Sequence, residues 1–144
     1  MEHSLNDVLV ELHVPDFGKA KAFYGKFGFE IVWERLPDAD KGYLVMKRGN
    51  SVLCFWPGTD FASKHLYFQE FPADTPRGYG VELVVMVENL DELYVVARDA
   101  GAVVEDMKVQ PWGLRDFRII DPFGYYLRLT TPHNILDSGN AIPD

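Results

Sequence analysis

The sequence contains a single cysteine, Cys54, which excludes an internal disulfide and a cluster of thiolate metal ligands. Positive charge is also scarce, because 14 lysines and arginines stand against 22 acidic residues and leave a net charge of −8. Such a chain lacks the excess of cations that binds phosphate, so we expect neither nucleic acid nor an anionic membrane as a partner. The acidity allows a cationic ligand, and it also serves solubility.

Long apolar runs are missing as well. The longest, Leu83 to Val87, is far shorter than the roughly 20 residues that a membrane-spanning helix needs. Residues 1–8 contain two acids and no apolar stretch of the kind found in a signal peptide, so we expect a cytoplasmic protein. With 144 residues, 47% of them hydrophobic, the chain can bury a real core, and we expect one domain over residues 1–144.

The first half of the sequence predicts one helix among four strands. Residues 8–14, VLVELHV, alternate in polarity as a strand does. Asp16 then stands at the N-cap of a helix that Gly28 ends. The apolar positions of this helix are Ala20, Phe23, Tyr24 and Phe27. Three strands follow in FEIVWERL, GYLVMKRG and SVLCFW, with a turn at residues 37–41 between the first two.

The second half repeats this design. Adding 73 carries Gly28 onto Gly101, and a shift of 74 matches VLCF at 52–55 to YLRL at 126–129. Repeated units of this kind bury their apolar faces only together. We therefore predict an α+β fold of two tandem βαβββ modules whose curved mixed sheets surround a cavity. The modules cover residues 7–56 and 80–131, with a linker at 57–79 and a C-terminal tail at 132–144.

The repeat resembles the vicinal oxygen chelate superfamily, through VPDFGKAKAFYGKFGF in the first module and DPFGYYLRL at the end of the second. This superfamily includes glyoxalase I, extradiol dioxygenases, fosfomycin resistance enzymes and bleomycin-binding resistance proteins. The stretches NLDELY at 89–94, QPWGLRDF at 110–117 and DPFG at 121–124 are similar to the bleomycin-binding branch. For that branch the resemblance implies a homodimer with ligand crevices between subunits, and sequestration of a cationic glycopeptide without chemistry.

Enzymes of the superfamily bind a divalent metal at four equivalent strand positions, which the resemblance assigns to Leu9, Cys54, Glu82 and Arg128. Leu9 has no donor atom and Arg128 is a permanent cation, so at most Glu82 and Cys54 remain for a metal. We therefore predict no metal, no cofactor and no catalytic residue. If the family geometry holds, Glu82 and Arg128 face each other and can pair in the place of the metal.

Strand alternation gathers the candidate ligand-binding side chains on one face, with Trp112 near its rim in the QPWG turn. They are Glu11, His13, Trp56, Glu82, Met86, Trp112, Asp116, Arg118, Tyr126 and Arg128. Flat rings among acids and bases can stack on a planar group and fix its orientation. Phe23, Phe29 and Phe117 are expected in the core instead.

Three functions remain open. The leading one is metal-free sequestration of a planar, bleomycin-like antibiotic, which the arginines permit if Asp116 and Glu82 neutralise Arg118 and Arg128. The second is a metal-dependent lyase or dioxygenase with a displaced site at Glu11, His13 and Glu82. The third is a binding protein for another metabolite, including an anion held by the two arginines.

Overall fold

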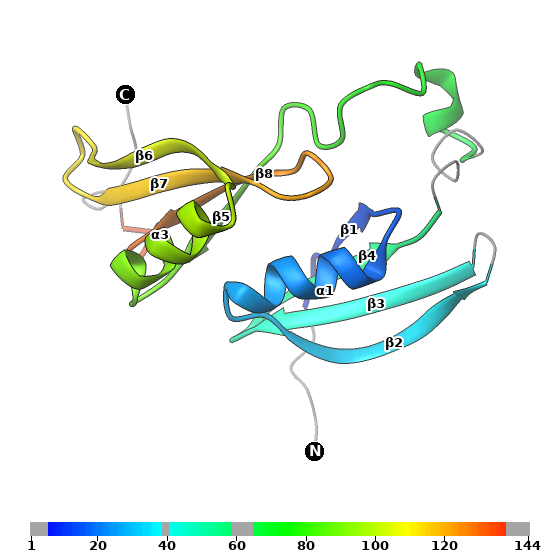
Figure 1. The fold of residues 1–144 in the computed structure, drawn as a ribbon, viewed down its shortest axis with the longest axis horizontal. Coiled ribbons are helices and arrows are strands. Elements are labelled where there is room, and N and C mark those ends of the chain that lie inside the picture. The colour runs from blue at the N-terminus through cyan, green and yellow to red at the C-terminus, as the bar shows by residue number, and fades with distance from the viewer. Residues whose placement is uncertain (1–5, 39–40, 59–64, 138–144) are drawn as a thin grey trace. The chain divides into compact units, whose positions relative to one another are not determined.

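A computed structural model describes residues 6–38, 41–58 and 65–137 of the chain. The chain divides into two compact units, Met1–Thr75 and Pro76–Asp144, which we call unit 1 and unit 2. Each unit contains a four-stranded mixed sheet and a ten-residue helix (Figure 1). The predicted α+β fold of two tandem βαβββ modules is therefore confirmed.

Unit 1 follows the predicted order of elements. They are β1 (Val10–His13), α1 (Phe17–Lys26), β2 (Glu30–Asp38), β3 (Lys41–Arg48) and β4 (Ser51–Trp56). The sheet has the strand order β1-β4-β3-β2, in which β1 and β4 are parallel and the other pairs antiparallel. The turn predicted at residues 37–41 is too long, because β2 continues to Asp38 and β3 already begins at Lys41. Residues 39–40 lie outside the described part.

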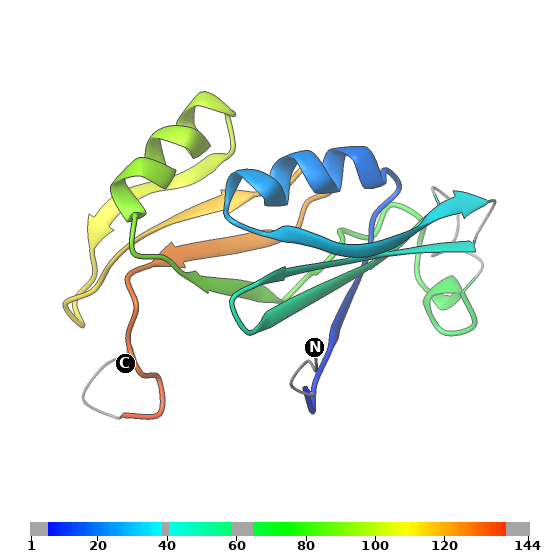
Figure 2. The ribbon, with the colours of Figure 1, turned by 90° about the horizontal axis from the view of Figure 1, so that it is seen from below.

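The sequence signals at the start of α1 act as predicted. The Asp16 carboxylate accepts a hydrogen bond from the backbone N–H of Lys19 at 3.0 Å, which satisfies a donor that the first turn leaves open. The helix lies along one face of its sheet (Figure 2) and buries Phe17, Ala20, Phe23 and Tyr24 there. The Tyr24 ring lies 5.3 Å from the ring of Phe55 on β4, so aromatic packing fixes the helix to the sheet.

Unit 2 repeats the arrangement. Its elements are β5 (Glu82–Met86), α3 (Leu90–Asp99), β6 (Val103–Val109), β7 (Arg115–Ile120) and β8 (Tyr126–Thr130). The strand order is β5-β8-β7-β6, and the parallel pair is again the first strand with the last. Helix α3 packs through Leu90, Leu93 and Ala97, and the Tyr94 ring lies 5.0 Å from that of Phe117. No helix in the described residues is long and apolar enough to cross a membrane.

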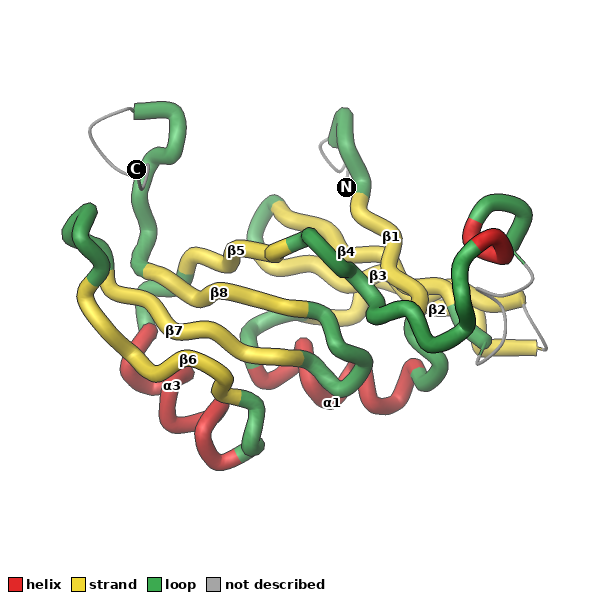
Figure 3. The backbone as a smooth tube through the Cα atoms, turned by 90° about the horizontal axis from the view of Figure 1, so that it is seen from above, coloured by secondary structure: helices red, strands yellow, loops and turns green. Residues whose placement is uncertain are grey.

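In each unit the α-helix lies along one face of the sheet, and among the described residues the opposite face carries no α-helix (Figure 3). Alternation along the strands then separates two sets of side chains. The helix-covered faces hold a dense core that includes Leu12, Leu44, Phe55, Phe117, Leu127 and Leu129. Phe23, Phe29 and Phe117 are buried, as predicted. The opposite faces, which we call the helix-free faces, carry the polar and aromatic side chains discussed below.

The segment predicted as a linker covers residues 57–79, and its described part, 57–58 and 65–79, contains a turn of 3₁₀ helix at Phe68–Glu70. The boundary between the two units falls within it, after Thr75. The rings of His65 and Phe68 lie 5.8 and 6.4 Å from that of Trp56 on β4, so this part of the segment packs on unit 1.

Leu129→Ala tests the core of unit 2. Leu129 is fully buried on the helix-covered face, so its truncation is expected to lower the free energy of unfolding by about 2–5 kcal/mol in urea denaturation. Leu136→Ala is the matched control, because Leu136 is 91% exposed and its truncation is expected to cost under about 0.5 kcal/mol. Equal costs for the two substitutions would contradict this packing.

Candidate functional site

The helix-free face of unit 1 is rich in aromatic rings. Trp33 on β2 stacks on Tyr43 of β3, with ring centroids 5.7 Å apart and planes 28° from parallel. Trp33 remains 47% exposed, so one flat indole surface is accessible. Such a surface can stack on a planar ligand, and its aromatic area gives binding energy at a small cost in side-chain entropy.

Two predicted site residues, His13 and Trp56, lie at the β1–β4 end of this face. They are opposite each other in the parallel pair, and their ring centroids are 4.6 Å apart. His13 is buried, and its Nε2 atom contacts the backbone carbonyl of Gly58. Trp56 stacks in turn on Phe68, with planes only 10° from parallel. These contacts make His13 and Trp56 part of a packed aromatic row.

Glu11 is held by a residue that the sequence analysis did not include. The hydroxyl of Tyr43 donates a hydrogen bond to Oε2 of Glu11, and Cys54 lies beside both residues in the strand register. Burial raises the pKa of the Tyr43 hydroxyl well above its usual range, and the hydrogen bonds to Glu11 and Cys54 act in the same direction. Tyr43 is therefore a neutral donor that orients the Glu11 carboxylate.

The helix-free face of unit 2 is charged, and its centre is Glu82. Oε1 of Glu82 lies 3.1 Å from Nε of Arg128 and 3.4 Å from Nε of Arg118, so one carboxylate serves two guanidinium groups. The pair of Glu82 and Arg128 expected from the register is therefore present. The Nε–H group of Arg128 does not donate a hydrogen bond to Glu82, since the buried Nε atom has no hydrogen-bond partner. We therefore treat this contact as an ion pair.

Arg118 has two further carboxylate neighbours. Its Nη1 atom lies 2.7 Å from Glu105 on β6 and 3.8 Å from Asp116. Burial lowers the pKa of the Arg118 guanidinium, but the hydrogen bond to Glu105 and the charges of Glu82 and Asp116 outweigh it and raise the pKa overall. The neutralisation predicted for Arg118 thus comes mainly from Glu105, with Glu82 and the more distant Asp116 adding to it.

Asp116 itself is almost completely buried. Its Oδ1 atom accepts a hydrogen bond of 2.6 Å from the side-chain amide of Gln110, which precedes the turn that carries Trp112. Trp112 is half-buried in that turn, and a hydrogen bond from the Gly113 N–H to the Gln110 carbonyl closes the turn. Asp116 therefore ties the turn to β7 and is shielded from direct contact with a ligand.

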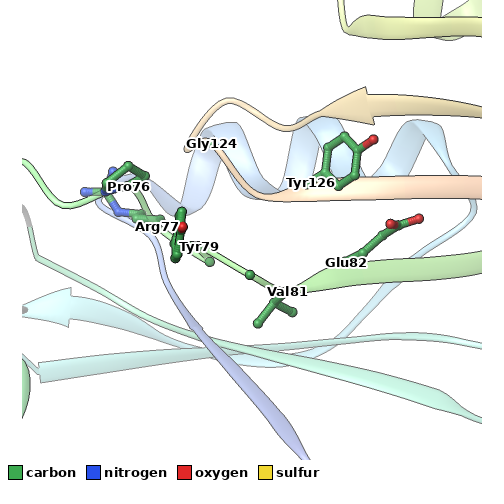
Figure 4. Close-up of a pocket in the computed structure, with 9 residues that line it drawn as sticks. Pro76, Arg77, Tyr79, Val81, Glu82, Gly124 and Tyr126 are labelled. Atoms are coloured by element: carbon green, nitrogen blue, oxygen red, sulfur yellow. The ribbon is translucent and has the colours of Figure 1, made fainter.

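An open hollow of about 380 Å³ lies at the start of β5 (Figure 4). Residues 76–82 form one wall, and Gly124 and Tyr126 form the other. The Asp121 carboxylate accepts hydrogen bonds from the N–H groups of Phe123 and Tyr125 at 2.8 Å, which shapes the turn before Tyr126. Tyr126 pairs with Glu82 on the neighbouring strand, so the hollow opens beside the charged face.

Tyr126 and Met86 complete the predicted set. Burial raises the pKa of the Tyr126 hydroxyl; the charge of Arg118 opposes this shift, and the carboxylates of Glu105 and Glu82 add to it, so that the pKa is raised overall. The side chain is therefore a neutral hydrogen-bond donor at ordinary pH. Met86 lies opposite Thr130 at the other end of the parallel pair, where it is half-buried.

The residues that the resemblance assigns to the four superfamily metal positions do not fit a divalent cation. Leu9 has no donor atom and is 56% exposed, and Cys54 is buried beside Tyr43. Glu82 is engaged by two arginines, one of which, Arg128, occupies a ligand position itself. Within residues 6–38, 41–58 and 65–137, no group of three or more His, Cys, Asp or Glu side chains could hold a metal ion.

Sequence reasoning missed three residues of these faces: Trp33, Tyr43 and Glu105. Tyr43 lies two residues before Val45, which is paired with Cys54, so alternation from Cys54 could have found it. Trp33 and Glu105 follow irregularities in β2 and β6 that interrupt the alternation of side chains. No signal in the sequence marks those irregularities.

The raised pKa of Tyr43 predicts a missing step in an alkaline titration. Its phenol is expected to stay protonated in the folded chain up to about pH 11, where an unperturbed tyrosine is largely ionised. The phenolate absorbance of folded Tyr43→Phe should then equal that of the parent chain, whereas in denaturant the parent should gain one additional tyrosine. A folded parent that exceeds Tyr43→Phe by nearly a full tyrosine at about pH 11 would contradict the assignment.

Several solved structures resemble this chain in fold. A bleomycin resistance determinant encoded on the transposon Tn5 is 22% identical, with a TM-score of 0.59, 90% of this chain covered and 100% of that one. A bleomycin-binding protein complexed with bleomycin is also 22% identical, with a TM-score of 0.55 and the same coverage. TioX from Micromonospora sp. ML1 is 21% identical, with a TM-score of 0.60 over 92% and 100% of the two chains.

A search of curated proteins finds no match to this chain. The family model described as the Glyoxalase/Bleomycin resistance protein/Dioxygenase superfamily, in contrast, matches residues 6–129, which include the first module and the second as far as Leu129. With this match over most of its length, and with two mixed sheets each built from a βαβββ module, the chain belongs to the Glyoxalase/Bleomycin resistance protein/Dioxygenase superfamily.

Proposed function

We propose that this protein binds a planar small molecule without a metal ion and sequesters it, with a bleomycin-like antibiotic as the leading example. The observation that carries the proposal is the accessible ring stack of Trp33 and Tyr43 beside an oriented carboxylate, Glu11. Flat rings bind planar heterocycles, and a nearby acid attracts a cationic substituent. The overall net charge of −8 favours the same class of ligand.

The chemistry of the donor set supports binding without metal. A metal-dependent enzyme of this superfamily would need donors where the chain has Leu9 and Arg128, and neither residue supplies one. The displaced set of Glu11, His13 and Glu82 is less favoured, because Tyr43 binds Glu11, the Gly58 carbonyl contacts Nε2 of His13, and two arginines share Glu82. Each of these contacts would have to break before a metal could bind.

The structures with bleomycin in their descriptions support the choice of ligand class. One of them is a bleomycin resistance determinant and another a bleomycin-binding protein in complex with the drug, and both share this fold over 90% of the chain. We propose antibiotic resistance by sequestration as the corresponding role. A homodimer with shared crevices and a cytoplasmic location remain predictions.

Calorimetric titration of the metal-stripped protein with metal-free bleomycin tests the proposal. We expect a dissociation constant in the micromolar range or tighter. Trp33→Ala should weaken binding about three- to tenfold, because it removes a stacking contact of roughly 0.5–1.5 kcal/mol. Trp33→Phe is the matched control, since it keeps a ring on the same face and should retain most of the affinity.

Titrations with zinc, nickel and manganese in place of the drug supply the opposing outcome. Tight metal uptake that disappears in His13→Ala, together with no drug binding, would favour the metalloenzyme and refute sequestration. Drug binding that needs one of these metals would also contradict a metal-free site.

A further inference from the structure

We propose that Arg128 binds an oxyanion of the ligand, so that the small molecule carries a carboxylate or phosphate group next to its planar part. This inference rests on the proposed function, metal-free binding of a planar small molecule, and names the substituent that unit 2 would recognise on such a molecule. It concerns the helix-free face of unit 2, whose charged side chains take no part in the ring stacking proposed above.

The two arginines of this face differ sharply in their surroundings. Arg118 has three carboxylates within 4 Å, at 2.7, 3.4 and 3.8 Å, and its side chain is only 15% exposed. Its charge is therefore neutralised within the protein. Arg128 has one ion pair among the described residues, with the Glu82 oxygen that it shares with Arg118. Its terminal nitrogens make no hydrogen bond to the described residues.

The orientation of Arg128 determines which atoms a ligand can reach. Its Nε atom is buried and lies 3.1 Å from Glu82, so a ligand must approach the terminal nitrogens Nη1 and Nη2. These two donors form one edge of the planar guanidinium group, which matches the spacing of two oxygens in a carboxylate or phosphate. Arg128 thus offers a two-donor edge that the protein itself does not occupy.

The register makes this arrangement unfavourable for the protein alone. Arg118 and Arg128 are direct partners in the β7–β8 ladder, and like charges in such positions destabilise a sheet. The shared Glu82 offsets this repulsion between the two strands. A local departure from the rules of stability is expected where a residue serves binding, and an oxyanion would supply the acceptor that the terminal nitrogens of Arg128 lack.

The neighbours of Arg128 fit the planar part of such a ligand. Its partner in the β5–β8 ladder is Val84, which is 41% exposed and provides an apolar surface. Tyr126 lies two residues before Arg128 on the same face and leads into the hollow. A ring carrying an acid group could rest on Val84 and Tyr126 while its oxyanion binds Arg128.

The face has no surplus of positive charge to attract anions in general. Glu82, Glu105 and Asp116 oppose the two arginines, and Lys108, the partner of Asp116 on β6, brings the sum to zero. Binding would therefore depend on the hydrogen-bond geometry of Arg128 rather than on a net positive electrostatic potential of the face. Arg128→Lys, which keeps the charge but loses the two-donor edge, is then expected to bind as poorly as Arg128→Gln.

Benzoate and benzamide form the probe pair for this subsite, because they share size and ring and differ in the charge of the head group. Nuclear magnetic resonance titrations would follow the Val84 methyl groups and the Arg128 Nε–H signal. We expect benzoate to bind at least about tenfold more tightly than benzamide, and both Arg128→Gln and Arg128→Lys to lose about tenfold in benzoate affinity. Phenyl phosphate is the second acid, and the tighter of the two acids identifies the oxyanion.

Arg115→Gln is the matched control. Arg115 is also on β7, but it pairs with Asp91 of α3 at 3.0 Å on the helix side, so its loss should leave benzoate binding within about twofold. Equal affinity for benzoate and benzamide, no binding of either acid, or unchanged benzoate affinity in both Arg128 variants would each overturn the subsite.

Metal-free bleomycin, titrated into the same samples, separates this proposal from the one it rests on. Drug binding without benzoate or phenyl phosphate binding would overturn only the oxyanion subsite. Benzoate binding that depends on Arg128, with no drug binding, would support the subsite and refute the bleomycin-like ligand.

Discussion

The charged face of unit 2 depends on one carboxylate that lies between two guanidinium groups. Without Glu82, the directly paired Arg118 and Arg128 would face each other with only Glu105 and Asp116 on the far side of Arg118. Partly buried cations in that position repel each other and keep part of their desolvation cost. The contact with Glu82 therefore allows a charged row to exist on a sheet whose other face is a dense apolar core.

The corresponding row in unit 1 shows how far the two modules have diverged in chemistry. Across unit 1 the paired residues are Glu11, Cys54, Val45 and Trp33, and across unit 2 they are Val84, Arg128, Arg118 and Glu105. Equivalent strand positions thus carry mainly apolar and aromatic side chains in one unit and mainly charges in the other. The backbone pairing can stay the same because only the helix-free face varies, while the helix-covered face keeps the core.

The difference between the helix-covered and the helix-free faces explains which features could be predicted from the sequence. Asp16, Gly28 and the apolar positions of the first helix predicted the first module, and the shift of 73 to 74 residues located the second. The pairing of Glu82 with Arg128 was implied by the resemblance to the superfamily, and the ion pair is present in the structure. Elements that are determined by local hydrogen bonding and by the periodicity of apolar residues can therefore be predicted from the sequence.

Other parts of the candidate site depend on irregular pairing and could not be read in the same way. Irregularities in β2 and β6 change which residues share a face, so Trp33 and Glu105 were left out. Glu105 matters most, because its 2.7 Å contact with Arg118 is the shortest in the charged network. It leaves Arg128 as the less neutralised of the two arginines, a difference that alternation alone did not reveal.

A double-mutant cycle on Glu82 and Arg128 tests whether their ion pair stabilises the charged face of unit 2. The free energies of unfolding of the parent, Glu82→Gln, Arg128→Gln and the double variant would be measured in urea at low and high salt. We expect a favourable coupling of at least about 0.5 kcal/mol that shrinks as salt is added, because both side chains are partly exposed. Additive effects within about 0.3 kcal/mol at low salt would contradict an ion pair at the centre of this face.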